Sequence, residues 1–274
     1  MSKAIIFTLA IVALSISSVV VNAYNVVDVD ADTSGTITLS QFQCLAQQNE
    51  KIIIEAWSGG IGLNKNLAAA YQRATAAKLQ VDLYAFFCSK CDGNNPVSNP
   101  IKTLKSYFME NDINFGTLWI EVEQCDGCWS GSVSENAQFV VQTVKAAISL
   151  QITIGIYSSV DEWAQTVGSF DDYSALKQWY AHYDGVPSFN DTEYYSYGGW
   201  TKPTMKQYIG NTQQCGVNVD LNYFAGFSPT TVIITSGSHS STGTSSSTGS
   251  SSTSGSGSAT GSTAGQTSTS GSSY

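Results

Sequence analysis

The chain has 274 residues and a formal net charge of −9, so nucleic acids and anionic membrane surfaces are poor partners for it. Two histidines, His182 and His239, leave little material for a Ser-His-Asp triad, and no glycine-rich phosphate loop is present. We therefore expect no cofactor and no metal, and we expect His182 to be an outward or hydrogen-bonded residue of a strand.

The first residues have the features of a signal peptide. Lys3 precedes an apolar run over residues 4–21, and Val21-Asn22-Ala23 supplies small residues for signal peptidase. The alternative, an uncleaved membrane anchor, is disfavoured by the short apolar stretch and by the cleavage site. We predict a signal peptide over residues 1–23 and a mature chain that begins at Tyr24. Such a protein would be secreted to the extracellular space or held in endolysosomal and phagosomal vesicles.

The part of the chain from residue 24 to residue 227 alternates short β-branched runs with segments of helical period, which is typical of βα units around a parallel sheet. Helical spacing covers residues 67–78, 101–111 and 137–148, and the later connections look shorter and less helical. The sequence predicts an α/β fold, an irregular (β/α)8 TIM-like barrel with its site at the carboxyl ends of the strands. The eight predicted strands are residues 25–28, 52–57, 81–87, 117–123, 153–157, 178–183, 205–208 and 217–221.

A calcium loop is one alternative for residues 30–41. Asp30, Asp32, Ser34 and Gly35 fall at EF-hand positions, but Gln41 stands where a bidentate Glu is needed. The preceding residues also read as a strand, not as an entering helix.

Six cysteines in an exported chain predict disulfides, and they allow fifteen pairings. Cys88–Cys91 and Cys125–Cys128 can each close locally, which leaves Cys44–Cys215 to join the two ends of the domain. The same two C-x-x-C pairs would alternatively form a four-cysteine zinc site, a reading that export weakens.

Two carboxylates stand out at the end of the strand predicted over residues 117–123. Residues two apart on a strand face the same side, so Glu121 and Glu123 should point together while Ile120 and Val122 face the covering helices. Like charges in one small space raise one pKa and leave a proton donor beside an ionised partner. Glycoside cleavage requires this arrangement.

More polar and aromatic residues lie at predicted strand ends. Asp28 ends the first strand and Asp220 lies in the last, so a closed barrel would make them neighbours at the same mouth. Each has an alternative as a helix cap or backbone ligand, and strand aromatics often belong to the core. Their common placement favours a sugar site. The candidate substrate-binding aromatics are Tyr84, Tyr157, Trp179, Tyr183 and Tyr208.

From about residue 235 to Tyr274 the sequence is almost wholly Ser, Gly and Thr. This composition buries too little apolar surface to offset ordering entropy, so we expect a disordered tail over residues 235–274. We expect no lipid anchor there, because the tail ends in Gly-Ser-Ser-Tyr without an apolar stretch. The sequon Asn190-Asp191-Thr192 predicts glycosylation of Asn190.

At this point the residues resemble the family 25 glycoside hydrolases, in the lysozyme-like branch of nematodes and amoebae. The resemblance covers nearly all of residues 24–227. The segments that carry it are Val27-Asp28-Val29, Phe42-Gln43-Cys44, Leu118-Trp119-Ile120-Glu121-Val122-Glu123, Gly155-Ile156-Tyr157-Ser158-Ser159, Trp179-Tyr180-Ala181-His182-Tyr183-Asp184-Gly185, Gly198-Gly199-Trp200, Lys206-Gln207-Tyr208, Cys215-Gly216 and Val219-Asp220.

Such proteins are similar to muramidases that cut the β-1,4 bond after N-acetylmuramic acid, so the implied partner is bacterial cell-wall glycan. The resemblance implies that Glu123 is the general acid and that Glu121 stabilises the developing oxocarbenium or oxazolinium charge. It also implies that Asp28 and Asp220 orient the substrate and tune Glu123.

Two positions depart from the family. Its usual motif is Asp-x-Glu, and here the first acid is Glu121, whose extra methylene moves the carboxylate by about 1 Å, a misplacement that can cost roughly 10²-fold in rate. The second lies near Trp57-Ser58-Gly59, where bacterial members often carry an acid.

A Ser/Gly-rich tail on such a domain also resembles the counting-factor proteins that social amoebae secrete to regulate group size. The second hypothesis is therefore a signalling subunit with weak or no hydrolase activity, in a complex with other secreted subunits.

Overall fold

The structure is a computed structural model that describes residues 23–225. Except for Ala23, the predicted signal peptide lies outside the described residues, as do the predicted tail and His239. Within residues 23–225, no helix has the length and apolar character needed to cross a bilayer.

Nine strands lie within residues 23–225, and each of the eight predicted strands overlaps one of them. The additional strand has two residues and pairs antiparallel with Trp57 and Ser58. The strands are β1 (Ala23–Val29), β2 (Lys51–Ser58), β3 (Gly62–Leu63), β4 (Gln80–Phe86), β5 (Leu118–Glu121), β6 (Ile154–Ser158), β7 (Lys177–Ala181), β8 (Met205–Gln214) and β9 (Val217–Ala225).

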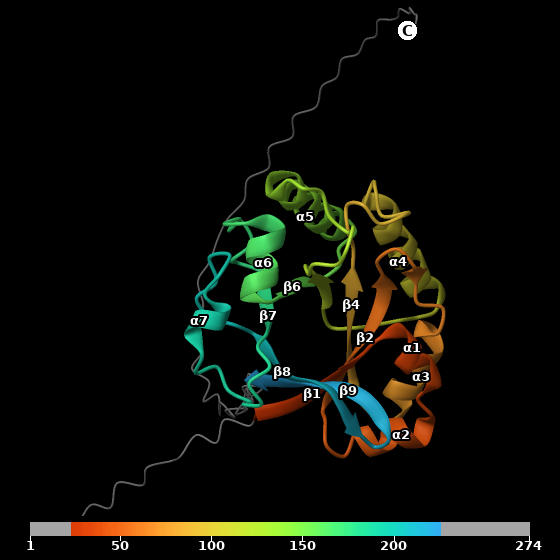
Figure 1. Ribbon diagram of the computed structural model, residues 1–274. Coiled ribbons are helices and arrows are strands. Elements are labelled where there is room, and N and C mark those ends of the chain that lie inside the picture. Colours follow the sequence, from red (N-terminus) through yellow and green to blue (C-terminus); the bar gives the residue numbers. More distant parts are fainter. Residues whose placement is uncertain (1–22, 226–274) are drawn as a thin grey trace, which may run out of the picture. The chain divides into compact units, whose positions relative to one another are not determined.

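Eight of these strands close into a barrel (Figure 1). Pairing runs parallel from β1 through β2, β4, β5, β6 and β7 to β8, and β9 then pairs antiparallel with both β8 and β1. The predicted α/β barrel is therefore correct in its eight strands, but the last βα unit is wrong. Because β8 turns directly into β9 at Cys215 and Gly216, which both have positive φ, the last two strands form a hairpin instead of a helical crossover.

Helices cover the outside of the strands (Figure 1). The three predicted helices are confirmed as α3, α4 and α5, and the later connections are shorter, as expected. Within the described residues the helices are α1 (Ala31–Thr36), α2 (Leu39–Leu45), α3 (Leu67–Ala76), α4 (Ser98–Glu110), α5 (Val133–Ser149), α6 (Val160–Val167) and α7 (Thr192–Tyr195).

The calcium alternative for residues 30–41 is wrong, because this segment forms two short helices. Asp30 caps α1 by accepting a hydrogen bond from the Thr33 backbone N–H at 2.6 Å. Thr38 and Gln41 form a reciprocal capping box at the start of α2. Two of the side chains that suggested ion ligands, Asp30 and Gln41, therefore satisfy helix ends.

The core has two parts. The larger lies between the strands and the helices, and the smaller fills the barrel with side chains such as Ile53, Trp119, Trp179 and Met205. Below this plug, at the amino ends of the strands, Asp82 accepts hydrogen bonds from Lys51 Nζ at 2.9 Å and Trp119 Nε1 at 3.2 Å. The interior of the barrel is thus filled between these amino ends and the carboxyl-end mouth.

All six cysteines are paired, as predicted: Cys44–Cys215, Cys88–Cys91 and Cys125–Cys128. The first bridge joins α2 to the turn between β8 and β9. The other two close adjacent loops after β4 and β5, where the Lys90 N–H donates to the Cys128 carbonyl at 2.9 Å. The cysteines that the zinc alternative needed are held in these two bridges.

Candidate active site

A cavity of about 130 Å³ opens at the carboxyl end of the barrel. The four acids predicted from the sequence all line it, although they come from three separate parts of the chain. The lining residues are Asp28, Tyr84, Glu121, Glu123, Tyr157, Trp179, Tyr183, Gln207 and Asp220.

Glu121 and Glu123 face the cavity together, as their spacing predicted. Ile120 and Val122 are buried in the outer core that packs against the helices. Strand β5 ends at Glu121, two residues earlier than expected, because the chain then turns away. The Trp129 indole N–H donates to the Glu123 carbonyl at 2.7 Å and holds this turn.

Asp28 and Asp220 are direct cross-strand partners in the antiparallel pair of β1 and β9. Asp28 is buried, and its carboxylate accepts hydrogen bonds from Asn222 Nδ2 at 2.7 Å and Gln207 Nε2 at 3.0 Å. Asp220 accepts from the Asn211 backbone N–H at 2.6 Å. The predicted neighbourhood of these two acids is confirmed.

Gln207 connects the two aspartates to two tyrosines. Its Nε2 lies 3.0 Å from Asp28 and 3.0 Å from Asp220, and its Oε1 accepts from the hydroxyls of Tyr157 at 2.6 Å and Tyr183 at 2.7 Å. Because tyrosine hydroxyls donate and carboxylates accept, the orientation of the amide is fixed. The sequence motif contained Gln207, but the prediction took its neighbour Tyr208 as the binding residue.

Four of the five predicted aromatics line the cavity, and Tyr208 does not. Successive residues on a strand face opposite sides, so Gln207 takes the inward position that the prediction gave to Tyr208. The pairing of β8 with β9 is irregular around these residues, which hid the inward position from simple strand counting.

Glu55 is a buried acid that the sequence reasoning missed. It is the cross-strand partner of Tyr84, which lines the cavity, and its Oε2 accepts from the Ala31 N–H at 2.8 Å. Glu55 lies on β2, two residues before Trp57. A charged residue inside the apolar run Ile52-Ile53-Ile54-Glu55-Ala56-Trp57 was the signal that could have identified it.

Burial and mutual repulsion raise the pKa of every acid around the cavity. Burial, with the nearby charge of Asp220, raises the pKa of Asp28 to about 7. Burial also raises the pKa of Glu55 and Asp220, although their backbone N–H donors partly oppose it. Burial raises the pKa of Tyr183 to about 12, so its hydroxyl stays protonated and acts as a donor.

Glu121 and Glu123 share a hydrogen bond. Burial and the charge of Glu123 raise the pKa of Glu121 well above its ordinary value. Burial also raises the pKa of Glu123, but its polar contacts with Glu121 and Tyr157 act in the opposite direction. Both carboxyl groups therefore hold a proton more readily than an exposed glutamate does, and they titrate as a coupled pair.

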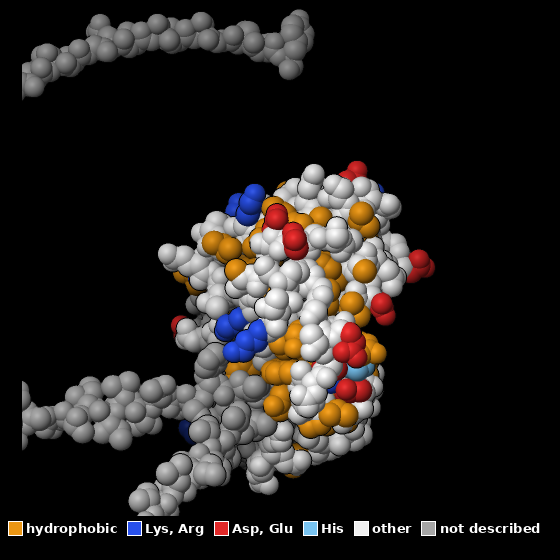
Figure 2. Space-filling view, turned by 90° about the vertical axis from the view of Figure 1, so that its left-hand side faces the viewer, with side chains coloured by type: hydrophobic (Ala, Val, Ile, Leu, Met, Phe, Trp, Pro, Cys, Tyr) orange, Lys and Arg blue, Asp and Glu red, His pale blue; other side chains and the backbone are white. Residues whose placement is uncertain are grey.

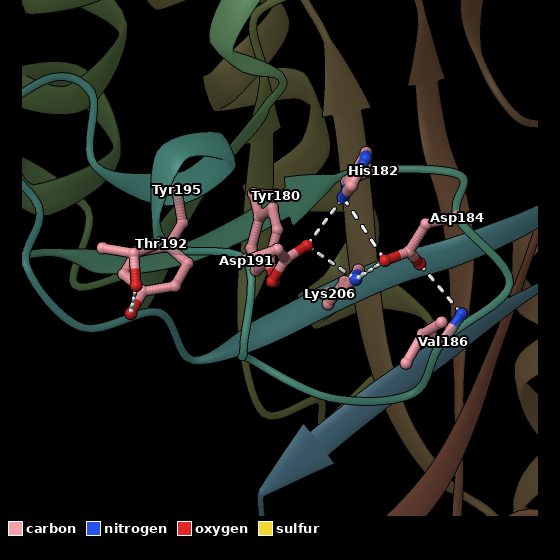
Figure 3. A network of polar contacts seen from close by, with 8 residues as sticks. All are labelled: Tyr180, His182, Asp184, Val186, Asp191, Thr192, Tyr195 and Lys206. Carbon is pink, nitrogen blue, oxygen red and sulfur yellow. Dashed lines mark hydrogen bonds and ion pairs between the residues drawn. The ribbon is translucent and has the colours of Figure 1, made fainter.

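A second polar cluster lies outside the cavity (Figure 3), and we call it the outer ionic cluster: Tyr180, His182, Asp184, Asp191 and Lys206. Ligand atoms of His182, Asp184 and Asp191 lie within 4.8 Å of one another, as in a metal site. Lys206 Nζ, however, lies 2.8 Å from Asp184 and 2.7 Å from Asp191. The ammonium takes the place that a cation would need. His182 ends up hydrogen-bonded and outside the cavity, as predicted.

A model of lysozyme-like protein 1 matches residues 23–208. Counting factor 50 of Dictyostelium discoideum is 50% identical over 74% of this chain and 67% of its own length. A probable glycoside hydrolase family 25 lysozyme, number 5, of the same organism is 35% identical over 70% of this chain and 88% of its own length.

Among solved structures, a muramidase from Acremonium alcalophilum has the same fold, with a TM-score of 0.57 and 18% identity over 75% of this chain and 95% of its own. The family match over residues 23–208 includes Asp28, Glu121 and Glu123 of the cavity and ends before β9. The chain belongs to the lysozyme-like proteins of glycoside hydrolase family 25.

Proposed function

We propose that this chain is a secreted muramidase-type glycosidase that cleaves the β-1,4 bond after N-acetylmuramic acid in bacterial peptidoglycan. The observation that carries the proposal is the convergence of Glu121, Glu123, Asp28 and Asp220 on one cavity. Trp179 and the tyrosines add apolar faces and hydroxyl donors suited to a sugar ring. Three disulfides support secretion, since they persist in oxidising compartments.

In the proposed reaction Glu123 protonates the glycosidic oxygen as the bond to the anomeric carbon breaks. In the reacting complex the carboxylate pair holds one proton on Glu123, and Glu121 is ionised beside the developing positive charge. A water molecule then adds its hydroxyl to the anomeric carbon and returns a proton to the carboxylate pair. At the end of the cycle the glycosidic bond is hydrolysed and the carboxylate pair again holds one proton.

The other acids would tune this pair. Asp28 and Asp220, held by Gln207, lie against the same cavity, and the negative charge of Asp220 favours the protonated form of Glu123. Glu55 places a further carboxylate next to Tyr84 and orients its hydroxyl at the rim. Together they keep a proton in the site near neutral pH.

The test is digestion of purified bacterial cell walls by the unmutated protein and by Glu123→Gln between pH 4 and 7.5. We expect the unmutated chain to release muropeptides, and we expect the variant to lose at least 10²-fold of that activity, because Gln cannot donate the proton. Mass spectrometry of the products should show N-acetylmuramic acid at the new reducing ends. An unmutated protein that releases no muropeptides would contradict the proposal.

A counting-factor-type role is the second candidate, favoured by 50% identity to counting factor 50. In this case the chain would be a secreted signalling subunit that regulates cell group size with other secreted subunits, and its hydrolase activity would be weak or absent. Adding purified protein to developing social-amoeba cells and measuring group size would test it. Glu123→Gln should act like the unmutated chain if signalling needs no catalysis.

A further inference from the structure

The outer ionic cluster lies directly behind two residues of the cavity. On β8, Lys206 joins the cluster and the next residue, Gln207, lines the cavity. After β7, His182 joins the cluster and the next residue, Tyr183, lines the cavity. Because neighbouring residues on extended chain face opposite sides, each pair presents one side chain to each site.

The cluster is tightly bonded. Lys206 is fully buried, and its ammonium lies between the carboxylates of Asp184 and Asp191. Asp191 also accepts from the Tyr180 hydroxyl at 2.6 Å and lies 2.7 Å from His182 Nδ1. Figure 3 shows His182 and Lys206, from neighbouring strands, pointing toward the same two aspartates.

Backbone bonds transmit this anchoring to the cavity. The His182 N–H donates to the Gln207 carbonyl at 3.0 Å, and the Gly185 N–H donates to the Tyr208 carbonyl at 3.0 Å. The turn after β7 is thereby attached to β8 at the residue whose side chain reaches Asp28 and Asp220. A small shift of β8 at Lys206 would displace the amide donor from both carboxylates.

We propose that Lys206 is a positioning residue of the active site: held by Asp184 and Asp191, it fixes the segments from which Gln207 reaches the two aspartates of the cavity and Tyr183 reaches Gln207. The effect on turnover rests on the muramidase function proposed above. The placement of Gln207 against Asp28 does not depend on that function, so it can be measured in a protein without activity.

The chain offers a matched control for Lys206→Met. Lys51 also binds a buried aspartate from a strand, with its Nζ 2.9 Å from Asp82, but it does so at the amino ends of the strands. Lys51→Met and Lys206→Met therefore both remove one lysine from a buried ion pair. Lys206→Met leaves the negative charges of two aspartates unpaired, which can prevent folding. The double variant Lys206→Met/Asp184→Asn removes one charge of each sign and should therefore fold more readily.

The first measurement is the titration of the Asp28 carboxyl carbon by NMR, assigned through Asp28→Asn. Asp28 faces Asp220, Glu121 and Glu123, with Gln207 and Asn222 as its donors. Loss of the Gln207 donor should raise the Asp28 midpoint by at least half a pH unit in Lys206→Met and in the double variant. Lys51→Met and the conservative Lys206→Arg should leave it unchanged.

The second measurement uses cell-wall digestion. Lys206→Met and the double variant should lose about tenfold or more in kcat, with a smaller change in KM. Lys51→Met should lose stability but should not show a loss in kcat that exceeds its change in KM. An Asp28 midpoint that stays unchanged in the folded double variant would overturn the proposal and leave Lys206 a structural residue. If the unmutated chain has no hydrolase activity, the proposed function fails, while the NMR result still decides the role of Lys206.

Discussion

Glu121 and Glu123 form a coupled pair of carboxyl groups. Burial and the charge of Glu123 raise the pKa of Glu121 well above its ordinary value, and burial also raises the pKa of Glu123. Two acids this close titrate as one unit, so the proton that Glu123 would deliver as the proposed general acid belongs to the pair.

The variant Glu121→Asp tests whether the site has adapted to the longer acid. Shortening the side chain should break the bond to Glu123, lower kcat by about 10- to 100-fold and move the basic limb of the pH profile upward, because the pKa of Glu123 loses a contact that lowers it. Rates measured on cell walls from pH 4 to pH 8 would show both effects. Higher activity in Glu121→Asp would mean that the cavity still fits the family's aspartate.

Tyr183 and Tyr208 allow the loss of a hydroxyl in the cavity lining to be compared with the loss of one outside it. Tyr183→Phe removes one hydroxyl from Gln207, and a net contribution of about 1 kcal/mol for one hydrogen bond predicts a roughly fivefold loss in kcat/KM. Tyr208→Phe removes a hydroxyl outside the cavity lining and should stay within twofold. Equal losses in both variants would restore Tyr208 to the binding site.

At the level of elements, the β8–β9 hairpin has a covalent attachment. The Cys44–Cys215 bridge spans a sequence separation of 171 residues and ties the hairpin turn to α2. Replacing both cysteines by Ala should lower the free energy of unfolding by about 2–5 kcal/mol, since long closed loops restrict the unfolded chain most. Removing Cys88–Cys91, which closes a short loop, should cost less. Urea unfolding of the two double variants would measure both losses. A larger loss in free energy of unfolding for the Cys88/Cys91 variant would contradict the expectation.

The sequence allowed much of the barrel and the four acids to be predicted, because both depend on local periodicity. Apolar runs located every barrel strand, and the i, i+2 spacing placed Glu121 and Glu123 together. The direction of β9 and the inward position of Gln207 depend on a hairpin with an irregular register, which local pattern does not encode. Glu55 was overlooked because an apolar strand was read as core throughout.

For the whole molecule, the acid cavity sets the pH dependence of stability. An acid whose pKa is raised on folding stabilises the folded state below its unfolded pKa, and this contribution is lost as pH rises through the folded value. For Asp28, the window runs from about 4 to about 7, with a slope of up to about 1.4 kcal/mol per pH unit. The hydrogen bonds and charge of Lys206 lower the pKa of Asp184 and Asp191 despite partial burial, so their contribution is lost only as pH falls below about 4.

We therefore expect maximal stability in mildly acidic solution, near pH 4–5. Urea unfolding between pH 3 and pH 8 should show a fall in unfolding free energy above pH 5 that is shallower in Asp28→Asn. A flat or rising profile from pH 5 to pH 7 would contradict the expectation. The same mild acidity is found in the endolysosomal and phagosomal vesicles that we proposed as one location.

The hairpin that closes the barrel also restricts how this family can vary in length. Asp220 reaches the mouth from the middle of β9, five positions after Cys215, and the bridge to Cys44 anchors the strand at its start. A one-residue insertion or deletion between them would rotate Asp220 out of the barrel and bring a neighbouring apolar residue in. Relatives that retain both the bridge and this acid should therefore keep the same number of residues between them.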